Sequence, residues 1–482
     1  MKNIQKLIFV VLLSSFSINS NGQSGNYGLA PNILPADVAT LGKFGSYPVS
    51  YYTGTANVSI PLFDFSDRDV SVNIGLQYDG AGFVPNKEPG TVGINWALSS
   101  GGVITRVVNW IGDDQIRSDI SGSLSKGFIY GINSVKTLYN KESIRNLSFL
   151  TINSQGTPTF NLAYEYCPDI FSFNFADYHG QFFMGNDGKI KVVCDKPLKV
   201  DVSQMNPQSD LILAYASSTI TITTENGDSY TFGGAFNTVD MNFSYSGVPG
   251  ANPVVDGKTA YINAWHLTKI KTHNGNVVNF EYTAQNPSDF YGGTQTQGVP
   301  SSIDYGYEKL YRHEELSFYD GSQGQWGSSP EYLVYQSFVK KTYLSKITGN
   351  AGSVEFSYSP EVQRFYKAGE NIRSPNIPKK LDQLTIRDSK GGLVKILNLN
   401  YTYYGSSAVG YREMLTGVKS IGGMDTATYS MDYYRTSELP DPLTKGIDIW
   451  GFYNGRNGNT TLIPTVSSGS PDYTVDWSSS NS

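Results

Sequence analysis

The chain has 482 residues with 50 glycines, 13% aromatic residues and a formal net charge of −6. Charged residues make up only 16% of it, whereas soluble domains average about 25%. Disorder needs few aromatic residues, a coiled coil needs heptads and collagen needs strict glycine periodicity, so these classes are excluded. What remains is an all-β protein with many turns, whose length would fill about three average domains.

Residues 1–22 have the pattern of a secretory signal peptide. Lys2 and Lys6 form a basic start, Leu7–Leu13 is an apolar core too short to cross a bilayer, and Gly22 suits cleavage directly after it. We therefore predict export to the bacterial envelope, either secreted or at the cell surface, with no membrane-spanning segment in the mature chain. The absence of a dense Lys/Arg cluster argues against nucleic acid as a partner.

Alternation of apolar and polar residues predicts strands along most of the remaining chain, as in Val70-Ser-Val-Asn-Ile-Gly-Leu76. The pattern divides the chain into regions that we expect to form one or two continuous sheet-built bodies. We predict an N-terminal β region over 23–115, a β meander over 116–235 that can include one short helix near 132–147, a hairpin-repeat β region over 236–466, and a loose tail over 467–482.

Cys167 and Cys194 are the only cysteines. A hairpin turning near Tyr178 would place Cys194 level with the turn, while Cys167 lies about nine residues away, or roughly 30 Å along an extended strand. A disulfide needs Cα atoms within about 7 Å. We therefore expect two free, largely buried thiols.

A hairpin pattern recurs in the second half of the chain. Its best copies are Trp265–Thr283 and Tyr343–Ser359, and weaker copies begin at Ser218, Leu384 and Leu415. Each copy predicts two alternating strands joined at a glycine-containing turn, with the apolar positions on one side. A single hairpin is marginal in water, so the copies are expected to stack side by side into an extended sheet or shell.

Two segments stand out as structural motifs. In the first, Trp96 is expected in the core with its N–H on a backbone carbonyl, and Gly101 and Gly102 are expected to supply positive φ or a close strand approach. Arg106 is expected to pair with an acid such as Asp113. In the second motif, Trp450 and Tyr453 are likewise expected in the core, and the segment is expected to pin the final strands; its selected residues are Asp448, Trp450, Gly451, Asn454 and Gly455.

The sequence contains few of the residue patterns that are typical of catalytic sites. The four histidines are His179, His266, His273 and His313, and none has the spacing of a metal-binding helix. There is no nucleophile elbow, P-loop or dinucleotide fingerprint. We predict no enzyme activity, no catalytic residue, no cofactor and no metal.

Two acidic clusters keep an alternative open. They could serve as a glycosidase acid and nucleophile or as Ca²⁺ ligands, although solvated turn acids are the favoured interpretation. The clusters are Asp64, Asp67 and Asp69, and Asp113, Asp114 and Asp119.

Several runs carry a family resemblance. Four of them resemble the N-terminal region of exported bacterial Rhs/YD-repeat proteins: GKFGSYPVSYYTGTANVSIPLFDF, VGINWALSSGGVITR (Val92–Arg106), PDIFSFNF and LPDPLTKGIDIWGFYNG (Leu439–Gly455). That region is similar to the start of the plasmid virulence B-protein and of the insecticidal toxin-complex B-subunit. The tandem YD repeats of the family are absent here.

The resemblance implies a partial Rhs-like shell of stacked antiparallel hairpins with a structural or interaction role in toxin delivery. The implied partner is a downstream YD-repeat or toxin polypeptide. The alternative is a glycan-binding cell-surface protein, with exposed tyrosine and tryptophan rings stacking on sugars. A glycosidase is the third candidate.

Overall fold

The computed structural model describes residues 58–109, 112–118, 124–129, 150–152, 158–160, 167–205, 217–246, 261–284, 307–315, 319–320, 325–326, 331–363, 365–366, 378–422, 425–448, 450–459, 465–468 and 473–476. These residues form an all-β fold, as predicted, and no helix of 7 or more residues occurs among them. The two 3-10 helices are η1 (Phe236–Thr238) and η2 (Thr436–Glu438). The helix expected near 132–147 lies outside the described residues.

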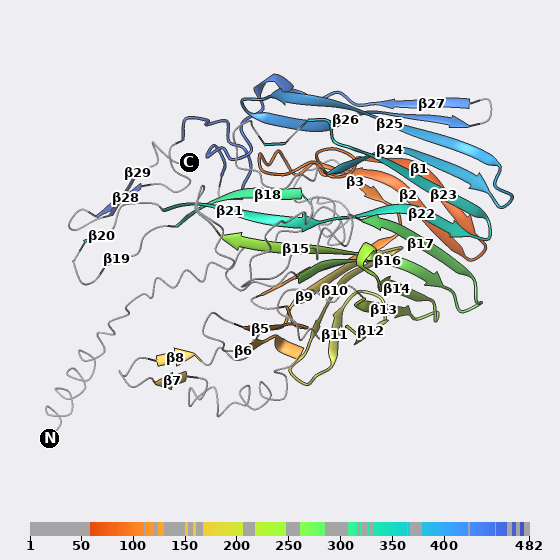
Figure 1. Ribbon diagram of the computed structural model, residues 1–482, viewed down its shortest axis with the longest axis horizontal. Coiled ribbons are helices and arrows are strands. Elements are labelled where there is room, and N and C mark those ends of the chain that lie inside the picture. The colour runs from red at the N-terminus through yellow and green to blue at the C-terminus, as the bar shows by residue number, and fades with distance from the viewer. Residues whose placement is uncertain are drawn as a thin grey trace, which may run out of the picture.

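A long antiparallel ladder forms the main sheet (Figure 1). Its strands pair in the order β12, β13, β14, β16, β17, β22, β23, β24, β25, β26 and β27. Their bounds are β12 (Leu198–Gln204), β13 (Thr219–Thr224), β14 (Ser229–Gly233), β16 (Tyr261–Lys271), β17 (Val277–Ala284), β22 (Thr342–Gly349), β23 (Gly352–Pro360), β24 (Lys379–Asp388), β25 (Leu393–Ser406), β26 (Gly410–Gly422) and β27 (Asp425–Ser430).

A second ladder branches from the first half of β16. It pairs β11, β10, β9, β4, β16, β15, β21 and β18 in that order. The new strands are β4 (Gly102–Val107), β9 (Ile170–Phe175), β10 (Tyr178–Met184), β11 (Ile190–Val193), β15 (Val239–Ser246), β18 (Tyr307–Glu315) and β21 (Glu331–Lys340). Because β16 belongs to both ladders, it joins the N-terminal strands to the hairpin repeats.

A three-stranded sheet packs against the main one. It contains β1 (Val58–Asp67), β2 (Val70–Tyr78) and β3 (Trp96–Ser99). Short two-stranded pairs complete the described elements: β5 (Ile116–Ser118) with β6 (Leu124–Lys126), β7 (Leu150–Ile152) with β8 (Pro158–Phe160), β19 (Tyr319–Asp320) with β20 (Gln325–Trp326), and β28 (Thr465–Ser468) with β29 (Tyr473–Asp476).

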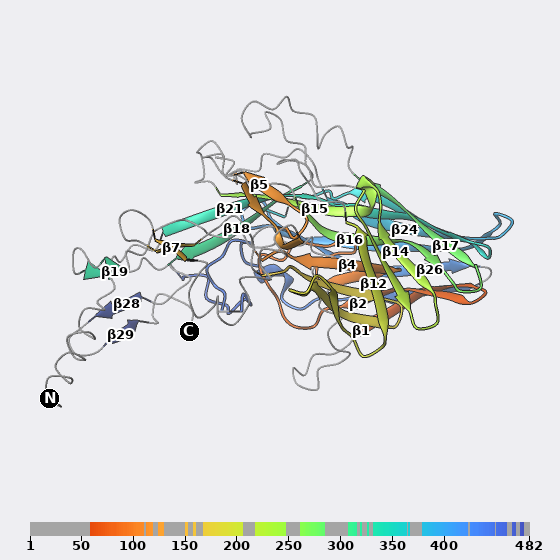
Figure 2. The same ribbon diagram turned by 90° about the horizontal axis from the view of Figure 1, so that it is seen from below.

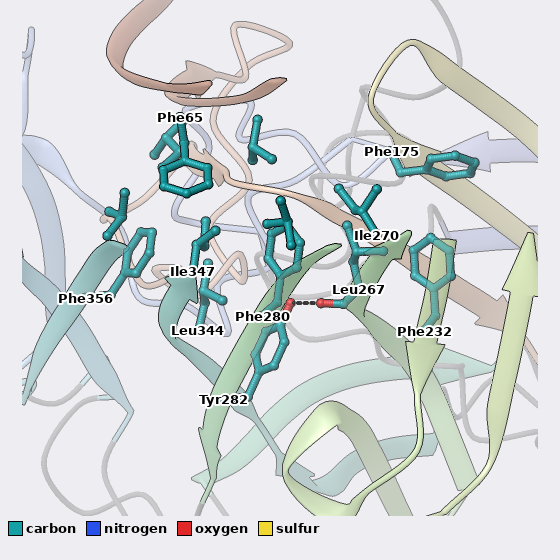
Figure 3. Close-up of a cluster of buried hydrophobic side chains, with 14 of the residues drawn as sticks. Phe65, Phe175, Phe232, Leu267, Ile270, Phe280, Tyr282, Leu344, Ile347 and Phe356 are labelled. Carbon is teal, nitrogen blue, oxygen red and sulfur yellow. Dashed lines mark hydrogen bonds between the residues drawn. The ribbon is translucent and has the colours of Figure 1, made fainter. Parts of the chain in front are cut away.

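The hydrophobic core lies between these sheets (Figure 3). Phe65 of β1 points toward Phe280 of β17 and Ile347 of β22, and all three are buried. Tyr282 is buried as well, and its hydroxyl donates to Leu267 O at 2.7 Å. The alternating apolar residues of the strands thus face one common interior, which is the reason that the hairpins form a sheet rather than separate units.

All five predicted repeat copies are hairpins. They are β13–β14, β16–β17, β22–β23, β24–β25 and β26–β27. Neighbouring hairpins also pair with one another, through β14–β16, β17–β22, β23–β24 and β25–β26. The predicted side-by-side stacking is therefore confirmed, while the predicted borders between regions remain predictions. Within the described chain, no helix is long and apolar enough to cross a bilayer.

Candidate functional site

The segment Val92–Arg106, selected from the sequence, runs between the end of the main sheet and the second ladder. At its start, Ile94 N donates to Glu413 O of β26 at 2.9 Å. Gly93 has φ +88°, and a Cβ there would lie 2.9 Å from Leu415 N. A glycine is needed at this position because the segment lies directly against the backbone of β26.

Trp96 is buried, as expected, at 3% exposure. Its indole N–H donates to the hydroxyl oxygen of Tyr433 at 2.8 Å, and that hydroxyl donates to Leu415 O at 2.7 Å. The expectation of a direct backbone-carbonyl partner was wrong: the tyrosine hydroxyl stands between the indole and the carbonyl. Trp96 therefore also binds the chain that follows β27.

Gly101 and Gly102 allow the close approach that the sequence predicted. A Cβ on Gly102 would stand 2.5 Å from Phe175 Cβ, and one on Gly101 would stand 2.9 Å from the ring of Phe280. Gly101 also has φ +151°. The pair lets the chain turn from β3 into β4 against two aromatic side chains.

Arg106 is fully buried on β4 and lies at the centre of an ionic cluster. Its Nη1 donates to Asp114 Oδ1 at 2.6 Å and lies 3.7 Å from Asp169 Oδ2, and its Nε donates to Ile262 O at 2.8 Å. The guanidinium carbon also lies 5.1 Å from the ring centroid of Trp265. The acid paired with Arg106 is thus Asp114 rather than Asp113, the example named from the sequence.

Asp113 has a different role in the same cluster. Its backbone N–H donates to Asp169 Oδ2 at 2.8 Å, while Asp169 N donates to Asp113 Oδ1 at 2.9 Å. Both residues are buried. This reciprocal pair ties the segment after β4 to the start of β9. Asp169 belongs to the PDIFSFNF run, which is the sequence signal that could have located it.

Three buried carboxylates surround one guanidinium, so the cluster carries excess negative charge when all of them are ionised. Burial raises the pKa of Asp169 to about 7, although Arg106 opposes the shift. Burial by itself would lower the pKa of Arg106, but Asp114 and Asp169 raise it above its ordinary value. The cluster therefore favours a charged arginine and a proton on Asp169 at mildly acidic pH.

This shift predicts a pH dependence. Below about pH 4, Asp169 is protonated in both the folded and the unfolded state. Between about pH 4 and 7 it is ionised in the unfolded state but still protonated in the folded state. The contribution of Asp169 to the free energy of unfolding therefore falls as the pH rises through this range. We expect the free energy of unfolding to fall less between pH 4 and pH 7 in the variant Asp169→Asn than in the unmodified protein. Urea unfolding at pH 4, 5, 6 and 7 measures the slope, with the exposed Asp432→Asn as control. Equal slopes for all three proteins would contradict the assignment.

A small pocket of about 110 Å³ lies under Gly101 and Gly102 and is lined by His266 and Tyr282 among others. His266 Nε2 lies 3.1 Å from Oδ2 of the buried Asp240. Burial would raise the pKa of Asp240, but His266 and Lys340 lower it below its ordinary value.

Asp240 also binds a third strand, since Thr342 N donates to its Oδ1 at 2.7 Å. The aspartate therefore links β15, β16 and β22. This pairing was not predicted: 26 positions separate Asp240 from His266, and the repeat pattern that includes His266 does not extend to Asp240.

The first acidic cluster is split by the fold. Asp67 is 1% exposed, so its interpretation as a solvated turn acid was wrong. Asp64 is exposed and accepts from Ser71 Oγ at 2.7 Å, and Asp69 accepts from Asn274 Nδ2 at 3.0 Å. Asp113 and Asp114 of the second cluster are buried as well, so the same interpretation was wrong for them, and Asp119 lies outside the described residues. No group of three or more metal-ligating side chains is found among the residues that were placed.

The late motif folds as a tight turn. Asp448 Oδ1 accepts from the backbone N–H groups of Trp450 and Phe452 at 2.9 Å each, and Gly451 and Gly455 have φ +88° and +79°. Trp450 is 75% exposed, so its expected core position was wrong: its backbone closes the turn and its ring points into solvent.

The rest of that turn binds the loop after β2. Tyr453 is half-buried, its N–H donates to Phe83 O at 2.9 Å, and Asn454 N donates to Gly446 O at 3.0 Å. Upstream, Pro440 O accepts from Arg412 Nη2 at 3.0 Å, as does Pro85 O. Burial lowers the pKa of Arg412 to about 10. Both parts of the late motif thus connect to residues 79–90.

The remaining selected residues lie apart from these clusters. Cys167 and Cys194 are free thiols, as expected, but Cys167 is exposed rather than buried. His273 Nδ1 lies 2.9 Å from Asp228 Oδ1 in neighbouring hairpin turns. His179 is half-buried on β10, and the side chain of His313 on β18 lies outside the described residues.

Solved structures that are similar to this chain share 11% of its sequence. The chain matches no family model and no curated protein sequence. It is similar to the solved N-terminal domain of the effector protein SpvB from Salmonella typhimurium strain LT2, with a TM-score of 0.31, 11% identity, and 79% of this chain and 100% of that chain covered. It is also similar to the TcdB2-TccC3-TEV structure, with a TM-score of 0.32, 11% identity, and 80% of this chain but 16% of that one covered.

Within the chain itself, the clusters at Arg106, Asp240 and Arg412 each join strands or loops that are distant in sequence. The chemistry that these arrangements support is the fixing of one strand against another.

Proposed function

We propose that this protein is an exported, non-catalytic wall segment of a β-sheet shell that takes part in toxin delivery. The observation that carries the proposal is the continuous addition of consecutive hairpins, β16–β17, β22–β23, β24–β25 and β26–β27, to one sheet. Repeated units that contact only their neighbours form extended walls and can be continued by further units of the same kind.

Strand β27 is the place where such a wall would continue. Among the strands that the structure describes, it ends the main ladder, and it pairs with β26 through Gly417–Gly422. Its residues from Thr426 to Ser430 are all exposed. An exposed end strand offers its backbone N–H and C=O groups to an added strand, so β27 suits the first hairpin of a second polypeptide.

The other parts of the proposal come from the sequence. The basic start and short apolar core of residues 1–22 support export to the cell surface or the medium. The motifs of Val92–Arg106 and Leu439–Gly455 resemble shell-forming Rhs/YD-repeat proteins and support a downstream YD-repeat polypeptide as the partner. The buried placement of Arg106, Asp113 and Asp114 supports a structural rather than a catalytic use of these charges.

The test is co-expression with the polypeptide of the reading frame that follows this one. We expect the two chains to co-elute on size exclusion, and we expect Ala427→Lys together with Tyr429→Lys to reduce co-elution at least tenfold. Lysine on an edge strand disfavours strand addition. Val193→Lys together with Val362→Lys is the matched control, since both residues are exposed and lie outside β27.

Two outcomes would overturn the proposal. One is a pair of chains that do not associate. The other is a β27 variant that co-elutes as well as the control. Loss of co-elution confined to the β27 variant would support it.

A further inference from the structure

The sheet formed by β1, β2 and β3 carries a groove on the face that points away from the core, with a volume of about 520 Å³. Binding sites for small ligands commonly have about 300–1,000 Å³. We propose that this groove binds a neutral oligosaccharide. Figure 2 shows β1 and β2 along the lower margin of the assembly of strands.

The shape of the groove follows from the strand register. Gly75 stands in the middle strand, opposite Pro61 on β1 and Ser99 on β3. This row therefore has small side chains or none on its outer face. The row on one side carries Gln77, and the row on the other side carries Asn73. The missing side chain at Gly75 creates a depression between two rows of longer polar groups.

The inner face of the same strands is fully occupied, so the outer face is free of a role in the core. Alternate residues of β2 point inward and are buried; these are Val70, Val72, Ile74 and Leu76. Asn73 is exposed and Gln77 half-buried. The polar groups of the groove are thus presented by a sheet whose position is set by the core beneath it.

The lining has the chemistry that a sugar requires. The amides of Asn73 and Gln77 both donate and accept, as do vicinal hydroxyls, and the carboxylate of Asp64 accepts. Asp64 is held in place by the hydroxyl of Ser71, which donates to it at 2.7 Å. The exposed ring of Pro61 supplies apolar surface for the C–H face of a sugar ring.

The charge of the groove argues for a neutral ligand. The described residues of its lining include one carboxylate, that of Asp64, and one ammonium group, that of Lys395 on β25. Lys395 Nζ also donates to Leu62 O at 3.5 Å. A phosphate or nucleic-acid site would carry an excess of positive charge, and a lipid site would lack the amides.

This site differs from the exposed tyrosine and tryptophan rings that the sequence offered for glycan binding. It also lies apart from β27, so it can be tested without the shell partner. Failure of co-elution at β27 would leave the groove unaffected, and failure of sugar binding would leave the shell proposal unaffected.

The test is saturation-transfer NMR and titration calorimetry of the full chain with neutral trisaccharides of glucose, N-acetylglucosamine, xylose and mannose. We expect at least one to bind, and we expect the double variant Asn73→Ala with Gln77→Ala to weaken that binding at least tenfold. Gly75→Val should also weaken it, because the new side chain would fill the depression.

Ser66→Ala is the matched control, since Ser66 is exposed on β1 outside the groove lining. Circular dichroism and the unfolding midpoint check that each variant is folded. Binding by none of the four sugars, or equal binding by the double variant and the control, would overturn the proposal.

Discussion

Replacing Arg106 with leucine is expected to lower the free energy of unfolding by about 3–5 kcal/mol, the range measured when one partner of a buried ion pair is removed. The fold makes this loss severe because Asp113, Asp114 and Asp169 would remain buried without their cation. Leucine would also leave Ile262 O without the Nε donor. The urea midpoint at pH 8, followed by tryptophan fluorescence, measures the change.

Two further variants separate charge from packing. Arg387→Leu is the surface control: its Nε lies 3.6 Å from Glu355, both side chains are partly exposed, and such pairs contribute about 0–1 kcal/mol. Combining Arg106→Leu with Asp114→Asn should recover part of the loss, because it removes one of the uncompensated charges. A loss no larger than that of Arg387→Leu would show that the cluster does not stabilise the fold.

Replacing Asp67 with alanine is expected to cost about 1.5–3 kcal/mol, the range for hydrogen bonds to a charged group. Asp67 closes the β1–β2 hairpin and contacts the turns of two repeat hairpins. Its Oδ2 accepts from Asn350 N, and its backbone O accepts from Asn276 Nδ2 at 2.7 Å. The two asparagines are linked in turn, since Asn350 Nδ2 donates to Asn276 Oδ1 at 2.7 Å.

Asp64→Ala is the control for this prediction. Asp64 lies three positions away in the same acidic cluster, but it is exposed and contacts a side chain of its own hairpin. Substitutions at such positions usually change stability by less than about 0.5 kcal/mol. If both variants unfold at the same urea concentration, Asp67 does not tie the hairpin turns together.

The hairpins were predictable because their signal is local. The copies at Trp265–Thr283 and Tyr343–Ser359 carry the strand alternation and the turn glycine within fewer than twenty residues each. The strand period and the turn geometry are properties of short segments, so a single sequence contains them. The stacking of the copies followed from the instability of an isolated hairpin.

The predictions that were wrong concern contacts between distant parts of the chain. Asp64 and Asp67 belong to one short run, yet Asp64 is exposed and Asp67 is buried. The difference arises because the tip of the β1–β2 hairpin contacts hairpin turns that lie more than 200 positions later in the chain. Trp450 has the residue type of a core side chain, but its turn leaves it in solvent. The Asp240–His266 pair depends on the register between β15 and β16, which neither residue reveals.

By itself, the sequence determined the all-β class, the five hairpins and their turns, and the importance of the segment from Trp96 to Arg106. It did so because strand alternation and turn residues act over a few positions. Only the tertiary structure decided which acid pairs with Arg106, what Trp96 binds, and where the outer face of β1–β2–β3 forms a groove. Those outcomes depend on strands brought together from distant parts of the chain, and burial there sets the strength of each charge interaction.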